Sequence, residues 1–309
     1  MLLREYILGR ILAVIPTAIV LSIITFFLIH MVPGDPVRMM VGEVGVDAAT
    51  VARIRSDLGL DDPITTQYMR YVSGVVRGDF GWSFRYKRPV ASLLFEQMPA
   101  TLSLAGTGML VAISLGVFAG VTASLHKGRW PDATVMLIAL FGVSMPAFWF
   151  ALLLLFAFAL HLGWFPTGGS EGLMSLVLPA IAVGYAGASL QARLIRSSML
   201  DVLSEDYIRT ARSKGLRDRA VIYKHALRNA LIPPLTMLGI QFGRLLGGTV
   251  VVETVFSRRG VGRLLVDAIM SKDYQLIQGG ILLAALSIVM VNLVTDVAYG
   301  FIDPRIRYN

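Results

Sequence analysis

Six long stretches of this chain contain almost no Asp, Glu, Lys or Arg, and they limit the fold more than any other feature of the sequence. A helix needs about 20 predominantly apolar residues to cross a membrane, and inside the hydrocarbon core it must satisfy its own backbone polar groups. Charged residues make up 16% of the chain, whereas about 25% is usual in soluble domains. We therefore expect an all-α integral membrane protein.

The apolar stretches predict six transmembrane helices, with both termini on one side of the membrane. The first stretch is longer than the apolar core of a signal peptide, so we expect it to be a retained span. The third has room for one span and a Gly/Pro-rich loop, but not for two spans. The six stretches are residues 11–31, 97–126, 133–170, 172–192, 230–256 and 274–295.

The distribution of cations predicts the orientation. Fifteen of the 28 Lys and Arg residues lie in the segments that this topology places on the side of the termini. Short loops rich in Lys and Arg stay in the cytoplasm. We expect both termini and the loop 193–228 in the cytoplasm, with residues 32–96 outside. The same rule accounts for the net charge of +8, so membrane lipid is an expected partner and nucleic acid is not.

The outer segment 32–96 carries signals for two amphipathic helices. Asp47 can cap a helix that Gly59 ends, and Asp62-Pro63 can start a second. The apolar positions repeat at helical spacing: Val51, Ile54 and Leu58 in the first helix, and Ile64, Tyr68, Tyr71, Val72 and Val75 in the second. We expect residues 1–98 to form the first span with this outer segment, and residues 99–309 to form a core of five spans.

A polar, cation-rich segment, residues 201–234, interrupts the apolar sequence and contains signals for a short helix. Ser204 can act as its N-cap, acids stand in the first turn, cations follow, and Gly215 stands where a left-handed residue ends a helix. Tyr207, Ile208 and Ala211 share one face. So short a helix is marginal alone and needs a surface to pack on. The segment can be a docking helix for a partner, or only a solvated basic loop.

This segment resembles the cytoplasmic loop of ABC importer permeases. The general pattern, Glu-Ala-Ala with a glycine four residues on, is matched here by Arg209-Thr210-Ala211 and Gly215, so the acid is missing. In lacking this acid, the chain resembles the peptide/nickel branch of these permeases, in the dipeptide/oligopeptide "B" subunit group. Its other motifs follow in order along the whole chain: Pro33-Gly34-Asp35-Pro36, Leu58-Gly59-Leu60-Asp61-Asp62-Pro63, Gly78-Asp79-Phe80-Gly81, Pro99-Ala100-Thr101-Leu102, Val252-Glu253-Thr254-Val255-Phe256 and Ile302-Asp303-Pro304-Arg305. Arg259 stands where the branch commonly has proline.

The resemblance implies a type I ABC importer permease fold in the bacterial inner membrane, with a cytoplasmic coupling loop at 195–232. It implies a heterodimer with a second permease, two cytoplasmic ATPases and a periplasmic or lipid-anchored solute-binding protein. The coupling residues would be Glu205, Asp206, Tyr207, Ile208, Arg209, Thr210, Ala211, Arg212, Lys214 and Gly215, with Tyr207, Ile208 and Ala211 inserted in an ATPase groove. The substrates would be dipeptides, oligopeptides or glutathione, with nickel or nickel chelates as the alternative.

The chain contains no Gly-x-x-x-x-Gly-Lys-Ser/Thr phosphate loop. We therefore expect it to be a transport subunit and not an enzyme, without a cofactor of its own, while ATP and Mg²⁺ bind to the partner ATPases. Its histidines are dispersed and it has no cysteine, so neither a metal site nor a catalytic site is expected.

Polar residues within spans usually face a cavity or the interior of the bundle. The candidates for the substrate path are Ser144, Met145, Pro146, Trp149, Gln241, Arg244, Gly248 and Glu253. Arg244 could favour a substrate that carries a carboxylate, or it could only tie spans together. A secondary transporter is a less favoured alternative, because it would need an intramembrane acid for ion coupling.

Overall fold

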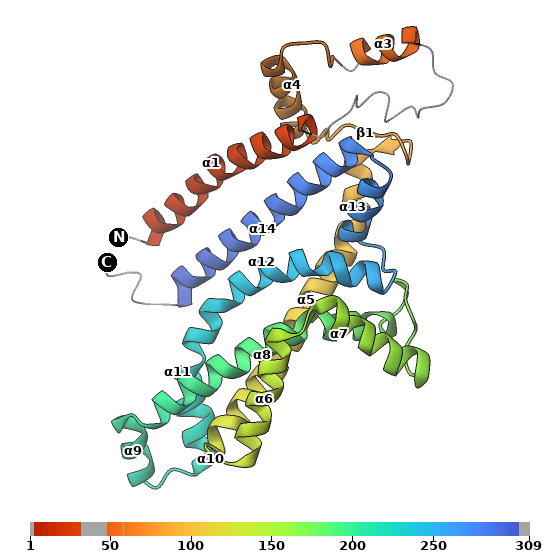
Figure 1. The fold of residues 1–309 in the computed structure, drawn as a ribbon. Helices are drawn as coiled ribbons and strands as arrows, with labels where there is room; N and C mark the ends of the chain where they lie inside the picture. The colour runs from red at the N-terminus through yellow and green to blue at the C-terminus, as the bar shows by residue number, and fades with distance from the viewer. Residues whose placement is uncertain (1–2, 32–47, 58, 303–309) are drawn as a thin grey trace. The chain divides into compact units, whose positions relative to one another are not determined.

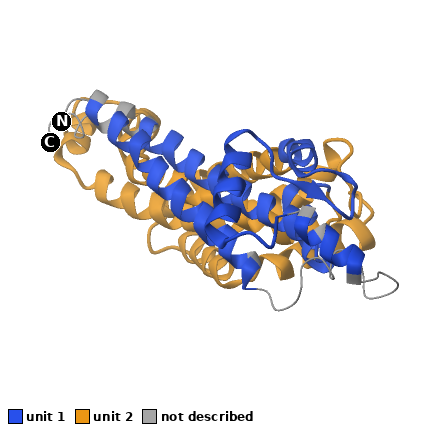
Figure 2. Ribbon diagram, turned by 90° about the horizontal axis from the view of Figure 1, so that it is seen from above, with its two compact units in different colours: residues 1–100, 259–309 blue, residues 101–258 orange. Residues whose placement is uncertain are grey.

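The computed structural model describes residues 3–31, 48–57 and 59–302, and most of these residues are helical. They form two compact units (Figure 2). Unit 1 consists of residues 1–100 and 259–309, and unit 2 consists of residues 101–258. Helix α5 (Val90–Leu125) begins in unit 1 and continues in unit 2.

Unit 1 is built on two long antiparallel helices, α1 (Leu3–His30) and α14 (Tyr274–Ile302), which pack along each other (Figure 1). An ion pair joins Arg10 of α1 to Asp296 of α14 at 3.2 Å. Asp296 is therefore engaged by Arg10. The remaining elements are α3 (Ala48–Asp57), α4 (Ile64–Val76), β1 (Trp82–Ser83), β2 (Arg88–Pro89) and α13 (Val261–Met270).

The two helices predicted in the outer segment are present as α3 and α4. Gly59 has a positive φ of 63° after α3, and Pro63 precedes the first residue of α4 as predicted. Asp47, the expected cap of the first helix, lies outside the described residues. The apolar face of α4 packs on α1, where Tyr68 bonds Ser22 at 2.9 Å and Tyr71 bonds Thr25 at 3.2 Å.

A short hairpin, β1–β2, is held to the start of α14 by side-chain acceptors. Trp82 pairs with Pro89 and Ser83 with Arg88. The buried Asp273 carboxylate accepts a hydrogen bond from Ser83 Oγ at 2.5 Å, and Gln275 Oε1 accepts one from the Trp82 N–H at 2.6 Å. These bonds satisfy polar groups at the end of the hairpin, as a buried site requires.

Unit 2 contains the rest of α5 and the helices that follow it along the chain. These are α6 (Trp130–Ser144), α7 (Ala147–Leu154), η1 (Leu155–His161), α8 (Met174–Leu203), α9 (Asp206–Ser213), α10 (Asp218–Ala220), η2 (Val221–Ala226), α11 (Leu227–Ala230) and α12 (Ile232–Val255). Helix α8 packs against α6, α7 and α12. Both η elements have the wide turns of a π-helix.

Among the described residues, five helices are long and apolar enough to cross a membrane, and a sixth span results if the bent pair α6 with α7–η1 counts as one. These elements coincide with the six predicted stretches. The sequence did not predict the size of the bend, which is 112°. At the break, Pro146 supplies no N–H, and Tyr185 Oη donates a hydrogen bond to the Met145 carbonyl. That bond satisfies a backbone group that the break would otherwise leave free.

Glycines let α8 approach its neighbours closely. A Cβ at Gly120 of α5 would lie 2.7 Å from the carbonyl oxygen of Ala192 and 2.8 Å from Cβ of Ile195. A Cβ at Gly142 of α6 would lie 1.9 Å from Ser189 Oγ. Small residues at such contacts are how helices pack in membranes, where burial from water gives little driving force between spans.

Candidate functional site

Helix α9 is the short helix that the polar segment predicts, and it begins one residue later than expected. Its N-cap is Glu205, which makes no side-chain capping bond. The prediction that Ser204 caps α9 is wrong, because Ser204 Oγ donates instead to the Asp201 carbonyl at the end of α8. The predicted end is confirmed. Gly215 has a positive φ of 77°, and the Leu216 N–H reaches back to the Ala211 carbonyl at 3.4 Å.

One face of α9 is buried in this chain's own core. Ile208 is 0% exposed and Ala211 is 8% exposed. They belong to an apolar cluster that draws on α5, α8, η2 and α11, and its other buried members are Val121, Ile195, Met199, Val221, Ala226 and Ala230. The expectation that Ile208 and Ala211 insert in an ATPase groove is therefore wrong. The pattern identified a buried face correctly, but its partner surface lies within unit 2.

The other face of α9 is exposed and carries charge of both signs. Tyr207 is 42% exposed, and its hydroxyl accepts a hydrogen bond from Asn229 Nδ2 of α11 at 2.8 Å. The Arg209 side chain is 79% exposed and reaches Asp206 at 3.6 Å, while Arg212 reaches Asp218 at 3.7 Å. Surface pairs at such distances hold little energy, so these cations can exchange partners. The predicted coupling residues on this exposed surface are Glu205, Asp206, Tyr207, Arg209, Thr210, Arg212, Lys214 and Gly215.

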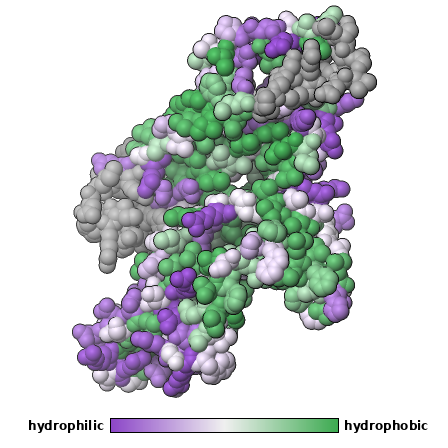
Figure 3. Space-filling model, viewed as in Figure 1, coloured by the Kyte–Doolittle hydropathy of each residue, from purple (hydrophilic) through white to green (hydrophobic). Residues whose placement is uncertain are grey.

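Hydrophilic residues gather over the end of unit 2 where α9 and α10 lie, and hydrophobic residues dominate along the spanning helices beyond it (Figure 3). The α9 surface is thus a polar platform attached to membrane helices by an apolar base. A partner that contacts this platform would act on α8, η2 and α11 together, because Ile208 and Ala211 join α9 to all three.

An ion pair with a buried acid joins the first turn of α6 to α8 near the same end. Asp132, 4% exposed, accepts two hydrogen bonds from Arg196, from Nε at 2.5 Å and from Nη2 at 2.7 Å. It also accepts the Gly128 N–H at 3.0 Å. The fork-like geometry of arginine and carboxylate fixes both direction and distance. Sequence analysis missed this pair, because 64 positions separate its members and only the fold brings them together.

The predicted substrate-path residues do not gather in one place. Gln241 is 5% exposed and bonds across to α8, accepting from Gln191 Nε2 at 2.9 Å and donating to the Gly187 carbonyl at 3.3 Å. Glu253 is 0% exposed and accepts from Thr101 Oγ1 at 2.7 Å. Both side chains point into unit 2 and join α12 to its neighbours, so neither lines an open path in this structure.

Other candidates are accessible. Arg244 is exposed on α12, and no ion pair involves it among the described residues. Gly248 lies one turn away and is partly exposed. Ser144, Pro146 and Trp149 are exposed around the α6–α7 break, while Met145 is half-buried there. The accessible candidates therefore form two groups, one on α12 and one at the bend.

Arg258, at the end of α12, is a buried arginine that sequence analysis did not single out. It is 5% exposed, and its Nη2 donates to Ser103 Oγ at 3.3 Å. Its Nε and Nη1 have no hydrogen-bond partner among the described residues. Burial lowers the pKa of Arg258, and the nearby Glu253 carboxylate opposes that shift. The sequence predicts that a cation in the loop after a span is exposed, so it contains no local signal for the burial of Arg258.

Comparison with solved structures identifies the fold. The methionine ABC transporter MetNI, in inward-facing conformations, aligns with a TM-score of 0.57 and 17% identity, covering 67% of this chain and 96% of that one. A second crystal form of MetNI gives a TM-score of 0.56. The fold is thus that of a type I ABC importer permease.

Comparison of sequences identifies the family. Residues 112–308 match the binding-protein-dependent transport system inner membrane component, and residues 2–105 match the N-terminal component of such systems. This chain belongs to that family of inner membrane permeases. It is 46% identical over 304 residues to the glutathione transport system permease protein GsiC of Escherichia coli K12, covering 98% of this chain and 99% of the relative. The GsiC protein of Salmonella choleraesuis is 45% identical over the same length.

We expect Asp132→Asn to lower the free energy of unfolding by about 2 kcal/mol, because it leaves the Arg196 guanidinium partly buried without its acid. Thermal unfolding of the solubilised protein measures the loss. A double-mutant cycle with Arg196→Gln should give a coupling energy of at least about 0.5 kcal/mol.

The matched control is the exposed pair of Arg88 and Glu96, whose side chains are 49% and 53% exposed at 2.9 Å. Its cycle should give a smaller coupling energy, because solvent screens exposed pairs. Equal coupling energies in the two cycles would show that Asp132 and Arg196 do not fix α6 to α8.

Proposed function

We propose that this chain is a permease subunit of an ABC importer that carries glutathione and related small peptides inward across the membrane. The observation that carries the substrate class is the 46% identity to a glutathione permease over nearly the full length of both chains. Arg244 of α12 is exposed and has no ion pair among the described residues. It agrees with a substrate that carries carboxylates, since an arginine fork matches a carboxylate in geometry and charge.

The subunit works with partners that supply recognition and energy. Its family requires a solute-binding protein and ATPases, and we propose two ATPases and a second, homologous permease. Because the chain has no phosphate loop, ATP and Mg²⁺ belong to the ATPases. We propose that α9 and both termini face the cytoplasm, as the excess of cations in the connecting loops supports.

We propose that α9 is the coupling helix. Its exposed face, around Tyr207 and Arg209, meets an ATPase, and its buried face fixes it to the bundle. When ATP binding closes the ATPase pair, a force on α9 moves α8, η2 and α11 as one body, since Ile208 and Ala211 are packed among them. The Asp132–Arg196 pair makes α6 follow α8. Rocking of such near-rigid bodies is the usual basis of alternating access.

The two faces of α9 should respond differently to mutation. The double change Tyr207→Ala/Arg209→Glu should reduce copurification of the ATPases and uptake, with little change in the unfolding temperature of the subunit. Ile208→Ala should instead destabilise the subunit, by about 2–5 kcal/mol, because it opens a cavity in a packed cluster.

Copurification and thermal unfolding, measured on the same preparations, separate these effects. Arg77→Glu, an equal charge reversal at an exposed residue of unit 1, serves as the control. If the Tyr207/Arg209 variant retained the ATPases and coupled transport as well as the unchanged protein, α9 would not be the coupling helix.

Arg244→Gln should slow uptake of labelled glutathione in cells that depend on this transporter, while Arg244→Lys retains part of the rate because it keeps the charge but loses the fork. The test compares initial uptake rates at equal amounts of subunit in the membrane. A deletion strain supplies the baseline. If deletion left glutathione uptake unchanged, the proposed substrate would be wrong. If deletion abolished it and Arg244→Gln did not slow it, only the role of Arg244 would be wrong.

A further inference from the structure

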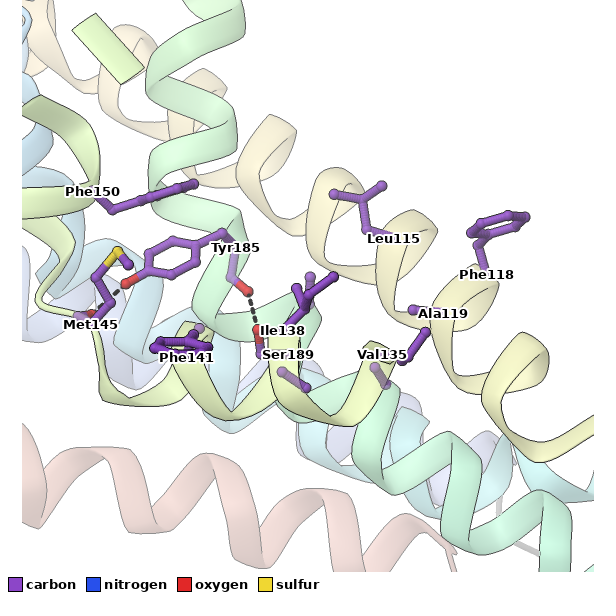
Figure 4. A pocket seen from close by; sticks show the side chains of 14 residues that line it. Leu115, Phe118, Ala119, Val135, Ile138, Phe141, Met145, Phe150, Tyr185 and Ser189 are labelled. Carbon is purple, nitrogen blue, oxygen red and sulfur yellow. Dashed lines mark hydrogen bonds between the residues drawn. The ribbon is translucent and has the colours of Figure 1, made fainter. Parts of the chain in front are cut away.

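Unit 2 contains a groove of about 390 Å³ between α5, α6 and α8, open along one side. Phe118 and Leu115 project from α5 at one end, and Tyr185 lies with Phe150 and Met145 at the other (Figure 4). Gly142 and Ser189 form part of the wall, at a close approach of α6 and α8. The groove contains none of the coupling residues, and Met145 is the only proposed path residue in its lining.

The lining of the groove suits a hydrocarbon chain. Its polar side chains, Tyr185 and Ser189, are already bonded inside the protein, to the Met145 and Tyr185 carbonyls respectively. On α6 and at its break, the lining runs from Val135 to Met145. Ten helical residues rise about 15 Å along the helix axis. This length is half of the ~30 Å thickness of the hydrocarbon core of a membrane. The length of the groove therefore matches one leaflet.

Exposed cations stand at one end of this groove. Arg193 follows the lining residue Ser189 by four positions on α8, so both lie on one face of that helix. Lys127 and Arg129 lie in the turn between α5 and α6. No ion pair involves Arg193 or Arg129 among the described residues.

A tryptophan places this end of the groove at the membrane surface. Trp130, the first residue of α6, is 79% exposed, and tryptophan is enriched at the level of lipid headgroups. Asp132 is the acid of the first turn of α6, and its carboxylate is occupied by Arg196 and Gly128. It therefore forms no ion pair with Arg193 or Arg129, and it attracts Lys127 only through space.

We propose that the groove binds one acyl chain of an anionic phospholipid, with its phosphate held by Arg193 and Lys127. An apolar slot one leaflet long, with exposed cations at its surface end, is complementary to the acyl chain and the phosphate of such a lipid. The bound chain would cover the seam between α6 and α8 beside the Met145 break. This inference concerns the subunit itself and does not depend on which solute the transporter carries.

The test measures lipid retained by the purified transporter complex. The complex is stripped with detergent, incubated with dioleoylphosphatidylglycerol or dioleoylphosphatidylcholine, and examined by native mass spectrometry. We expect retention of phosphatidylglycerol in preference to phosphatidylcholine. Arg193→Gln/Lys127→Gln should lower retention of phosphatidylglycerol by roughly tenfold or more. Arg77→Gln, which removes an exposed cation of unit 1, should leave it unchanged.

A second variant tests the apolar part separately. Ala119→Phe places a ring in the groove and should lower retention of both lipids, and if this variant does not fold, the charge variant still decides. Equal retention of the two lipids, or unchanged retention by Arg193→Gln/Lys127→Gln, would overturn the proposal. So would loss of the second permease from the Ala119→Phe complex with lipid retention unchanged, because the groove would then be a protein interface.

Discussion

The close packing of α8 against its neighbours is the contact on which the rest of unit 2 depends. In a membrane, helices gain little from leaving lipid for one another, so they associate through shape and internal polar bonds. Gly120 and Gly142 remove the side chains that would keep α5 and α6 away from α8. Gln191 and Arg196 then bond α8 to α12 and to the start of α6. The α9 surface and the groove between α5, α6 and α8 both depend on this central helix.

The attachment of α9 follows from the same helix. Ile195 and Met199 of α8 form part of an apolar cluster, and Ile208 and Ala211 of α9 pack in the same cluster. A helix of this length is marginal alone, so its stability comes from that contact. The surface that remains for a partner consists of Tyr207 and the exposed charged side chains around it. The buried face of α9 fixes the helix to the bundle, and its exposed charges can form and break contacts with a partner. Such a helix is suited to transmit force through a reversible contact.

Local patterns in the sequence predicted the elements well. Charge-free length predicted the spans, and Gly215 predicted the end of α9, because both depend on residues close together in the chain. The chain's long-range contacts were not predictable in this way. Ser204 carried a capping signal but bonds back into α8, and the apolar face of α9 did not reveal what covers it. Gln241 and Glu253 looked like path residues, yet Gln191 and Thr101 hold them inside. The predicted organisation, with an N-terminal part ending at residue 98, stays a prediction.

Coupling through α9 requires that this helix present one face to the ATPases and keep the other inside the bundle. The chain has no cysteine, so single cysteines can report each face in a clean background. Labelling by a water-soluble maleimide should modify Tyr207→Cys in the permease alone and much less when the ATPases are bound, while Ile208→Cys stays unlabelled in both. Equal labelling of Tyr207→Cys with and without the ATPases, or ready labelling of Ile208→Cys that the ATPases suppress, would contradict coupling through α9.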